Sequence, residues 1–249
     1  MKKTAAFLAV LMSAAVILGG CGSKKNKADI DDIATEQPTE RVSRNSEELE
    51  RLTRNTIDAE IVLTNGEIID MELYPDLAPK TVANFVKNVN EDFYTGTIFH
   101  RVIDGFMIQG GGYDEDCKLK SVSETVEGEF EDNGIENPLS HERGVISMAR
   151  TSEPNSASTQ FFIVQTDSTY LDGQYAAFGR VTAGMDVVDE IASSPKAEDP
   201  PSGFDDLTET LYVIESITIL SDTDAVLEED TELSDETEAD EEPTQKVSK

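Results

Sequence analysis

Cysteine and histidine are both scarce in this chain, and their scarcity removes several classes of site. Of 249 residues only two are cysteine and two are histidine. Two cysteines cannot build the disulfide framework of a small secreted domain, and a four-cysteine zinc site is excluded. A Cys2His2 site would need every cysteine and every histidine in the chain. We therefore expect no metal ion and no other cofactor.

Basic residues are also few. The chain has 20 Lys and Arg against 51 Asp and Glu, which gives a formal net charge of −31 at pH 7. Binding to nucleic acid needs clustered Lys and Arg at the phosphates, so nucleic acid is not expected as a partner. The length allows one large or two small domains.

The long hydrophobic run of the chain lies at its N-terminus. Lys2 and Lys3 precede an apolar stretch from Ala5 to Leu18, and two glycines follow it. The stretch is shorter than the roughly 20 residues that cross a bilayer as a helix. A basic start, a short apolar core and a small-residue exit are typical of a secretory signal peptide, here residues 1–20. The alternative, a buried helix, explains neither the basic start nor the polar stretch that follows.

Leu18-Gly19-Gly20-Cys21 ends this run and resembles the lipobox of bacterial lipoproteins. The resemblance implies cleavage before Cys21 and attachment of diacylglycerol to its thiol. Buried acyl chains would then hold the protein at the outer face of the cell membrane. Residues 21–54 are too polar to fold alone and predict a flexible tether, in which Ser46 to Arg54 has the spacing of a short helix.

The C-terminal segment, residues 222–249, is strongly acidic. Asp222 to Glu242 holds twelve Asp or Glu and no Lys or Arg. Like charges at this density repel each other and keep a chain extended, so we expect a disordered tail. Calcium binding is the alternative, but the tail lacks the ligand spacing and the glycine of an EF-hand loop.

The middle of the chain, residues 55–221, has the pattern of one β-rich domain. Ile57 to Leu73 alternates apolar and polar residues around Asn65-Gly66, which predicts a hairpin with a type I′ turn. Helical spacing predicts helices over Pro79–Asn90 and Met185–Ala192. Further strands are predicted at residues 97–103, 106–109, 144–148, 161–165, 177–181 and 211–220. Together these elements predict a mainly β fold, a closed antiparallel β-barrel capped by two α-helices.

Four motifs in this domain carry its chemistry. They are FHRVIDGFMIQGG at residues 99–111, GVISMAR at 144–150, STQFFI at 158–163 and LDGQYAAFG at 171–179. In this order they resemble the cyclophilin family of peptidyl-prolyl isomerases, and the resemblance extends over about Ala59 to Leu220. It implies a cyclophilin-like fold and isomerisation of X-Pro bonds.

The resemblance also implies the roles of ten residues. Arg101 would donate a hydrogen bond to the prolyl nitrogen and Gln109 would hold the substrate carbonyl. The backbone at Ala149 and Arg150 would hold the residue before proline, although most well-studied members have Asn where Arg150 stands. The implied pocket for the proline ring consists of Phe106, Met107, Phe162 and Leu171, with Gln160 behind it and Tyr175 where many members have His.

Other catalytic sets fit the sequence less well. Gly110–Gly112 lacks the Lys-Ser/Thr of a phosphate loop. His100 is expected to be a hydrogen-bonded structural residue, and no serine can be placed beside His141 from the sequence. Two alternatives to an isomerase stay open: a non-catalytic chaperone module that binds proline peptides on the same fold, and a hydrolase that uses His141.

The favoured hypothesis joins the segments into one protein. It is a monomeric, membrane-anchored prolyl isomerase whose partners are proline-containing unfolded or exported polypeptides.

Overall fold

The structure is a computed structural model that describes residues 46–120 and 124–221. The predicted signal peptide, the lipobox with Cys21, residues 21–45 of the tether and the acidic tail lie outside these residues. Within the described part of the chain, no helix is long and apolar enough to cross a membrane.

The predicted hairpin is present, but its turn differs from the prediction. Strands β1 (Ile57–Leu63) and β2 (Ile68–Leu73) pair antiparallel. A type I′ turn needs positive φ at both central residues, whereas Gly66 has φ +87° and Asn65 does not have a positive φ. The Gly66 N–H donates to the Leu63 carbonyl at 2.8 Å, and the Leu63 N–H donates to the Glu67 carbonyl at 2.9 Å. This is a three-residue loop in which glycine alone takes the left-handed conformation.

The sheet contains eight antiparallel strands in the order β3-β4-β6-β5-β7-β2-β1-β8. The remaining strands are β3 (Arg101–Ile103), β4 (Met107–Gly110), β5 (Val145–Met148), β6 (Phe161–Val164), β7 (Ala177–Ala183) and β8 (Ile214–Ile219). All but one of the predicted strands therefore lie within about three residues of their predicted bounds. The exception is residues 97–103, of which only the last three belong to a strand.

This short strand is the reason that the predicted closed barrel is wrong. The order of strands leaves β3 and β8 as the two edges of the sheet. Across this gap, residues 96–99 approach residues 212–214 through an isolated bridge between Ile98 and Val213 and through hydrogen bonds between Ile214 and residues 96 and 97, at 2.9 and 2.8 Å. The Phe99 N–H also donates to the Tyr212 carbonyl at 3.1 Å. The sheet thus curls toward closure without a continuous ladder across the gap.

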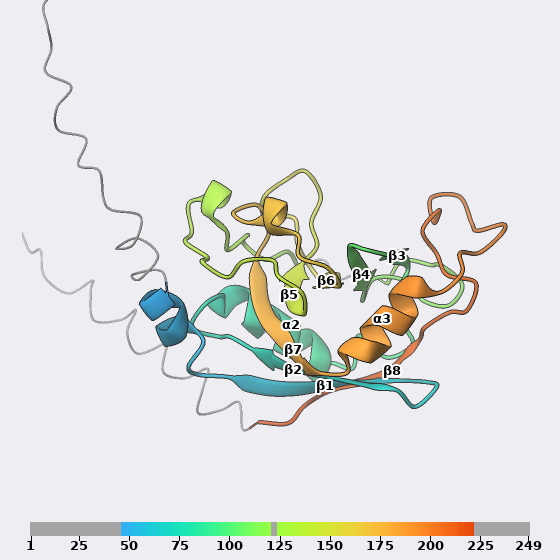
Figure 1. The fold of residues 1–249 in the computed structure, drawn as a ribbon, viewed down its shortest axis with the longest axis horizontal. Coiled ribbons are helices and arrows are strands. Elements are labelled where there is room, and N and C mark those ends of the chain that lie inside the picture. Colours follow the sequence, from blue (N-terminus) through green and yellow to red (C-terminus); the bar gives the residue numbers. More distant parts are fainter. Residues whose placement is uncertain (1–45, 121–123, 222–249) are drawn as a thin grey trace, which may run out of the picture. The chain divides into compact units, whose positions relative to one another are not determined.

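Two longer helices cover the curled sheet. Helix α2 (Pro79–Asn90) has the predicted bounds, with proline in its first turn where no backbone N–H is needed. Helix α3 (Met185–Ser193) extends one residue beyond the prediction. In Figure 1, α3 lies on the near side of the sheet and α2 on the far side. Two short 3₁₀ helices, η1 (Glu131–Asn133) and η2 (Thr169–Leu171), lie in the connections.

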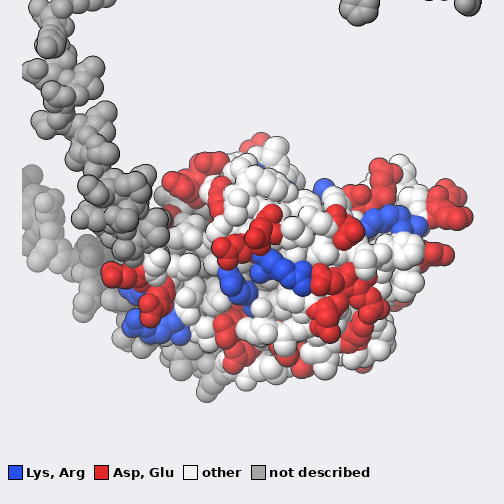
Figure 2. Space-filling model, in the orientation of Figure 1, with Lys and Arg blue, Asp and Glu red and all other residues white. Residues whose placement is uncertain are grey.

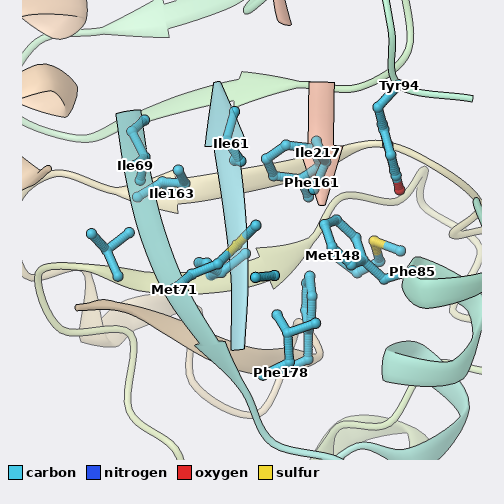
Figure 3. Packing of buried hydrophobic residues seen from close by; sticks show 14 of the residues in the cluster. Ile61, Ile69, Met71, Phe85, Tyr94, Met148, Phe161, Ile163, Phe178 and Ile217 are labelled. Carbon is cyan, nitrogen blue, oxygen red and sulfur yellow. The ribbon is translucent and has the colours of Figure 1, made fainter. Parts of the chain in front are cut away.

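The main core is formed by inward-facing residues of the sheet together with residues of α2 and α3. Figure 3 shows Phe85 of α2 among aromatic residues of the strands. Its ring centroid lies 5.6 Å from that of Phe161 and 5.4 Å from that of Phe178. Ile57, Ala59 and the other inward residues of β1 are at most 1% exposed, as the alternating sequence pattern requires.

A second, smaller apolar cluster lies apart from the main core. It includes Tyr74, Leu77, Met107 and Phe162. Residues 46–52 form a helix, the one that the spacing of the tether indicated, and its Leu49 and Leu52 pack against this cluster. The end of the predicted tether therefore contacts the folded domain.

Acidic side chains dominate the face of the domain shown in Figure 2, and basic side chains form separate groups on it, one of them near the middle. Arg143 binds both carboxylate oxygens of Asp189, at 2.8 and 2.7 Å. Arg180 lies 3.4 Å from Glu142. These pairs are exposed, so each contributes at most about 1 kcal/mol to stability.

Gly184 provides a test of how tightly the sheet and α3 are joined. It precedes α3 with φ +87°, and a Cβ atom there would overlap the Ile68 carbonyl oxygen and lie 3.0 Å from the Ile69 Cα. Gly184→Ala is expected to lower the free energy of unfolding by about 3 kcal/mol, measured by urea denaturation. Gly134→Ala is the control, since Gly134 has φ +84° but open space around it. Equal losses in the two variants would show that close packing at Gly184 contributes nothing.

Candidate active site

Three of the predicted site residues form one row across the sheet. Arg101 of β3 pairs with Gln109 of β4, and Gln109 pairs with Phe162 of β6. Directly opposed residues of neighbouring strands point to the same face, so these three side chains lie side by side. A cation, an amide and an aromatic ring are thereby brought together, although Arg101 and Phe162 are 61 residues apart in the sequence.

Strand alternation explains why only some apolar residues of these strands face the site. Met107 lies two residues before Gln109 and shares its face. On β6, Phe161 and Ile163 belong to the main core, whereas Phe162 and Val164 belong to the second cluster. Phe161 therefore faces the main core, and Phe162 faces the site.

These side chains surround a small pocket of about 140 Å³. Its volume is well below the 300–1,000 Å³ of sites for drug-sized ligands, so it suits one small ring. Nine of the ten predicted site residues line it: Arg101, Phe106, Met107, Gln109, Ala149, Arg150, Phe162, Leu171 and Tyr175.

Gln160, the tenth predicted residue, lies behind the pocket wall. Its Oε1 accepts a hydrogen bond from the Gln109 Nε2 at 2.9 Å. Gln109 uses one of its two amide N–H groups in this bond and retains the other. Gln160 is therefore placed to orient Gln109, as expected for a residue that supports the site from behind.

Arg101 lies at the rim of the pocket. Its side chain is 44% exposed, and its Nε lies 3.3 Å from the Asp206 Oδ2. The apolar wall beside it comes from Phe106 and Met107. The guanidinium can thus reach a bound ligand while it keeps contact with water.

Arg150 also lines the pocket, and contacts with two aromatic rings and a backbone carbonyl hold its side chain in place. Its guanidinium lies 4.8 Å from the ring centroid of Tyr175 and 4.9 Å from that of Phe130, and its Nε donates to the Gln174 carbonyl at 2.9 Å. The Ala149 N–H donates to the Gln160 carbonyl at 2.9 Å. That amide is therefore occupied, and a substrate contact here would have to use the Ala149 carbonyl or the backbone of Arg150.

A chain of polar groups lies directly behind Phe162, and the sequence did not reveal it. Asp172 Oδ1 lies 2.9 Å from the His141 Nδ1, and the His141 Nε2 lies 3.0 Å from the Ser147 Oγ. The His141 ring stacks on Phe162 with an interplanar angle of 15°. The arrangement is that of an acid-base-hydroxyl triad, and Ser147 is the serine that could not be placed beside His141 from the sequence.

This triad does not support a hydrolase. Ser147 is 0% exposed and His141 is 1% exposed. Neither lines the pocket, from which Phe162 separates them. A nucleophile must reach its substrate to within about 3–3.5 Å, which a fully buried hydroxyl cannot do. The three residues instead satisfy one another and support the pocket wall.

His100 is buried, as the sequence suggested, and interacts with the Ile98 backbone and the Gln160 side chain, but only part of its hydrogen-bonding capacity is used. It is 7% exposed, and its Nδ1 has no hydrogen-bond partner within the described residues. Its ring lies against Tyr113 with centroids 4.6 Å apart. Burial, with the positive charge of Arg101 as a smaller cause, lowers the pKa of His100 to about 4 and outweighs its favourable contacts with Ile98 and Gln160.

Asp206, Asp172 and Ser147 are the site neighbours that sequence reasoning missed. Asp206 lies 105 residues from Arg101 and Asp172 lies 31 residues from His141. Asp206 is one of 51 acidic residues and lies in none of the four motifs, and Asp172 lies in the LDGQYAAFG motif but has no sequence feature that links it to His141. Their proximity to the site comes from the three-dimensional fold alone.

The fold and the pocket define a class of protein: a curled antiparallel sheet with a small pocket in which apolar side chains lie beside an arginine and a glutamine. Comparison with known families agrees with this class. Residues 59–218 match the family described as cyclophilin type peptidyl-prolyl cis-trans isomerase. The chain belongs to this family.

Individual relatives support the same assignment. The chain is 50% identical over 137 residues to peptidyl-prolyl cis-trans isomerase A of Dickeya dadantii, covering 53% of this chain and 70% of the relative. It is 41% identical over 165 residues to peptidyl-prolyl cis-trans isomerase B of Escherichia coli, covering 63% and 96%. The structure of a Cryptosporidium parvum cyclophilin type isomerase is similar, with a TM-score of 0.55, 25% identity, and coverage of 68% of this chain and 99% of that one.

The protein is thus a peptidyl-prolyl cis-trans isomerase of the cyclophilin type, and proline-containing peptides are its substrates. The alternative of a non-catalytic peptide-binding module is not supported by these relatives.

Proposed function

We propose that Arg101 catalyses the isomerisation by donating a hydrogen bond to the prolyl nitrogen of a twisted peptide bond. The observation that carries this proposal is the row of Arg101, Gln109 and Phe162, which places a guanidinium beside an apolar pocket of the size of one ring.

The reaction requires only that the planar amide be disfavoured. Resonance gives the peptide bond a rotation barrier of roughly 18–20 kcal/mol, and uncatalysed X-Pro isomerisation takes tens of seconds or longer. When the bond twists, resonance is lost and the prolyl nitrogen regains a lone pair. A hydrogen bond to that lone pair is strong only in the twisted state, so it lowers the barrier and does not merely hold the substrate.

Arginine suits this role for physical reasons. It stays protonated at every physiological pH and has five N–H donors in a rigid plane. Phe106, Met107 and Phe162 would enclose the proline ring and exclude water, which stabilises the planar, charge-separated amide. Gln109, oriented by Gln160, would hold the neighbouring carbonyl with its remaining N–H. Substitution of Arg101 by alanine tests this role, and a large loss of kcat/KM for a proline peptide is the expected result.

We further propose that the enzyme acts outside the cell membrane, anchored through lipid on Cys21, and assists the folding of exported proteins as a monomer. The signal-like residues 1–20 and the lipobox support export and anchoring. Polypeptides that leave the membrane unfolded contain X-Pro bonds of both isomers, so a tethered isomerase would meet its substrates at their point of exit.

Metabolic labelling with a radioactive fatty acid tests the anchor. The protein is expected to carry label and to sediment with membranes, whereas Cys21→Ser is expected to be unlabelled. Cys117→Ser is the matched control, because Cys117 is the other cysteine and lies half-buried in the folded domain. Retention of label by Cys21→Ser would refute lipidation at this residue.

A further inference from the structure

We propose that Asp206 is a positioning residue that fixes the orientation of the Arg101 guanidinium during catalysis. This inference rests on the proposed role of Arg101. It concerns a carboxylate that none of the four sequence motifs contains and that does not line the pocket for the proline ring.

The contact between the two residues leaves the reactive end of the arginine available. Asp206 Oδ2 lies 3.3 Å from the Arg101 Nε, the nitrogen nearest the side chain's stem. The two terminal nitrogens carry four further N–H donors, which stay available to a ligand in the pocket. The ion pair at Nε therefore draws the guanidinium toward Asp206 without competing for the substrate.

Packing alone does not fix this side chain. Arg101 is 44% exposed, and it borders a second cavity of about 270 Å³ in addition to the proline pocket. Asp206 and His100 also line that second cavity. An arginine that borders two cavities retains several rotamers, and a misplacement of about 1 Å can cost as much as 100-fold in rate.

Asp206 is itself held in position by the backbone. Its carbonyl accepts a hydrogen bond from the Val102 N–H at 3.1 Å, so the loop pairs with the residue next to Arg101 on the outer edge of β3. Leu207, the next residue, is 5% exposed, and its N–H donates to the Phe204 carbonyl at 2.9 Å. Phe204 packs edge-on against Tyr113, with ring centroids 5.0 Å apart. The loop thus covers an unpaired strand edge and presents a carboxylate to Arg101 from a fixed place.

The experiment compares kcat and KM for a proline peptide in wild type, Asp206→Ala, Asp206→Asn and Asp205→Ala. Asp206→Ala is expected to lower kcat about tenfold with KM nearly unchanged. The reason is that Asp206 orients the Arg101 guanidinium, and this orientation is needed when the peptide bond is twisted and not when the substrate first binds. Asp206→Asn keeps an oxygen near the Arg101 Nε but removes the negative charge, and it is expected to lower kcat about threefold. Asp205→Ala is the matched control: it removes the neighbouring carboxylate and is expected to keep wild-type kcat. The melting temperatures are expected to agree within about 3 °C, since an exposed ion pair adds little stability.

The double variant Arg101→Ala/Asp206→Ala separates positioning from a general structural effect. If Asp206 acts through Arg101, the double variant is expected to be no less active than Arg101→Ala alone. Additive losses, a rise in KM in place of a fall in kcat, or equal behaviour of Asp206→Ala and Asp205→Ala would overturn the proposal. Wild-type activity in Arg101→Ala would instead refute the proposed role of Arg101 itself, so the two failures are distinguishable.

Discussion

Replacement of Arg101 by alanine is expected to lower kcat/KM for a proline peptide at least 100-fold. Removal of one hydrogen-bond donor that acts on the transition state typically costs about 100- to 1,000-fold in enzymes. The Arg101 side chain is 44% exposed and makes its ion pair at the surface, so the fold is expected to stay intact. A protease-free assay that follows cis and trans signals directly, such as NMR exchange spectroscopy, measures the loss.

Arg101→Lys is the control that keeps the positive charge but removes the planar guanidinium group. Lysine keeps the positive charge but has a single nitrogen on a flexible stem, so it is expected to recover only a small part of the activity. Gln109→Ala is expected to lose less than Arg101→Ala, because Gln109 would hold the substrate and would not act on the twisted bond. Activity of Arg101→Ala near that of wild type would contradict the proposed mechanism.

Acid is expected to destabilise the domain in the range from about pH 6.5 to pH 4. His100 has an ordinary pKa of 6.5 and a pKa of about 4 in the folded protein, mainly because of its burial. Folding therefore favours neutral His100, and its contribution is fully present above pH 6.5 and is lost as the pH falls toward 4. This difference in pKa corresponds to about 3 kcal/mol of folding free energy.

His141 contributes in the same direction. Burial lowers its pKa, and the opposing attraction of Asp172 does not cancel this effect. Asp116 is paired with Lys118 and Asp189 with Arg143, and these partners hold the pKa of each carboxylate below the usual 3.8. What these two carboxylates contribute to folding stability is therefore lost in more acidic solution. Among the described groups with a resolved shift, the two histidines are those whose pKa change falls between pH 6.5 and 4.

Urea unfolding at a series of pH values measures this dependence. His100→Gln cannot titrate in this range and is expected to show a smaller fall in stability between pH 7 and pH 5 than wild type. In His100→Gln/His141→Gln the dependence is expected to be nearly flat over this range. If wild type and His100→Gln lost stability equally on acidification, the assignment of this effect to His100 would be wrong.

The sequence predicted a helix or strand correctly where neighbouring residues determine its start, its end and its buried face. Helix α2 has its predicted bounds because Pro79 can start a helix and its apolar residues recur at helical spacing. The turn at Asn65-Gly66 was predicted less well. The Asn65 side chain accepts a hydrogen bond from the Glu67 N–H at 3.1 Å, an interaction that competes with the two-residue turn expected of Asn-Gly.

Closure of the sheet depends on interactions that no local pattern encodes. Residues 97–103 have strand composition throughout, yet only Arg101–Ile103 pairs in a ladder. Whether the preceding residues pair depends on the approach of residues 212–214, more than 100 positions away. Long-range approach of this kind is set by tertiary packing, which periodicity does not describe.

The pocket residues could be predicted because they occur in motifs that resemble a known family. Residues outside these motifs could not. Asp206 lies outside them and is one acid of 51. Asp172 and Ser147 lie inside two of the motifs, but nothing in the sequence links them to His141 until the fold places His141 between them. The short helix at residues 46–52 was indicated by spacing, but its packing against the cluster of Tyr74 and Leu77 was not.

The most direct test of the account measures binding and on-enzyme exchange in the same NMR sample. A proline peptide is titrated with wild type and with Arg101→Ala, and both the dissociation constant and the cis-trans exchange rate of the bound peptide are determined. If Arg101 acts on the twisted bond, the exchange rate falls at least 100-fold while the dissociation constant changes by less than about threefold. Weaker binding with an unchanged exchange rate for bound peptide would show that Arg101 only holds the substrate.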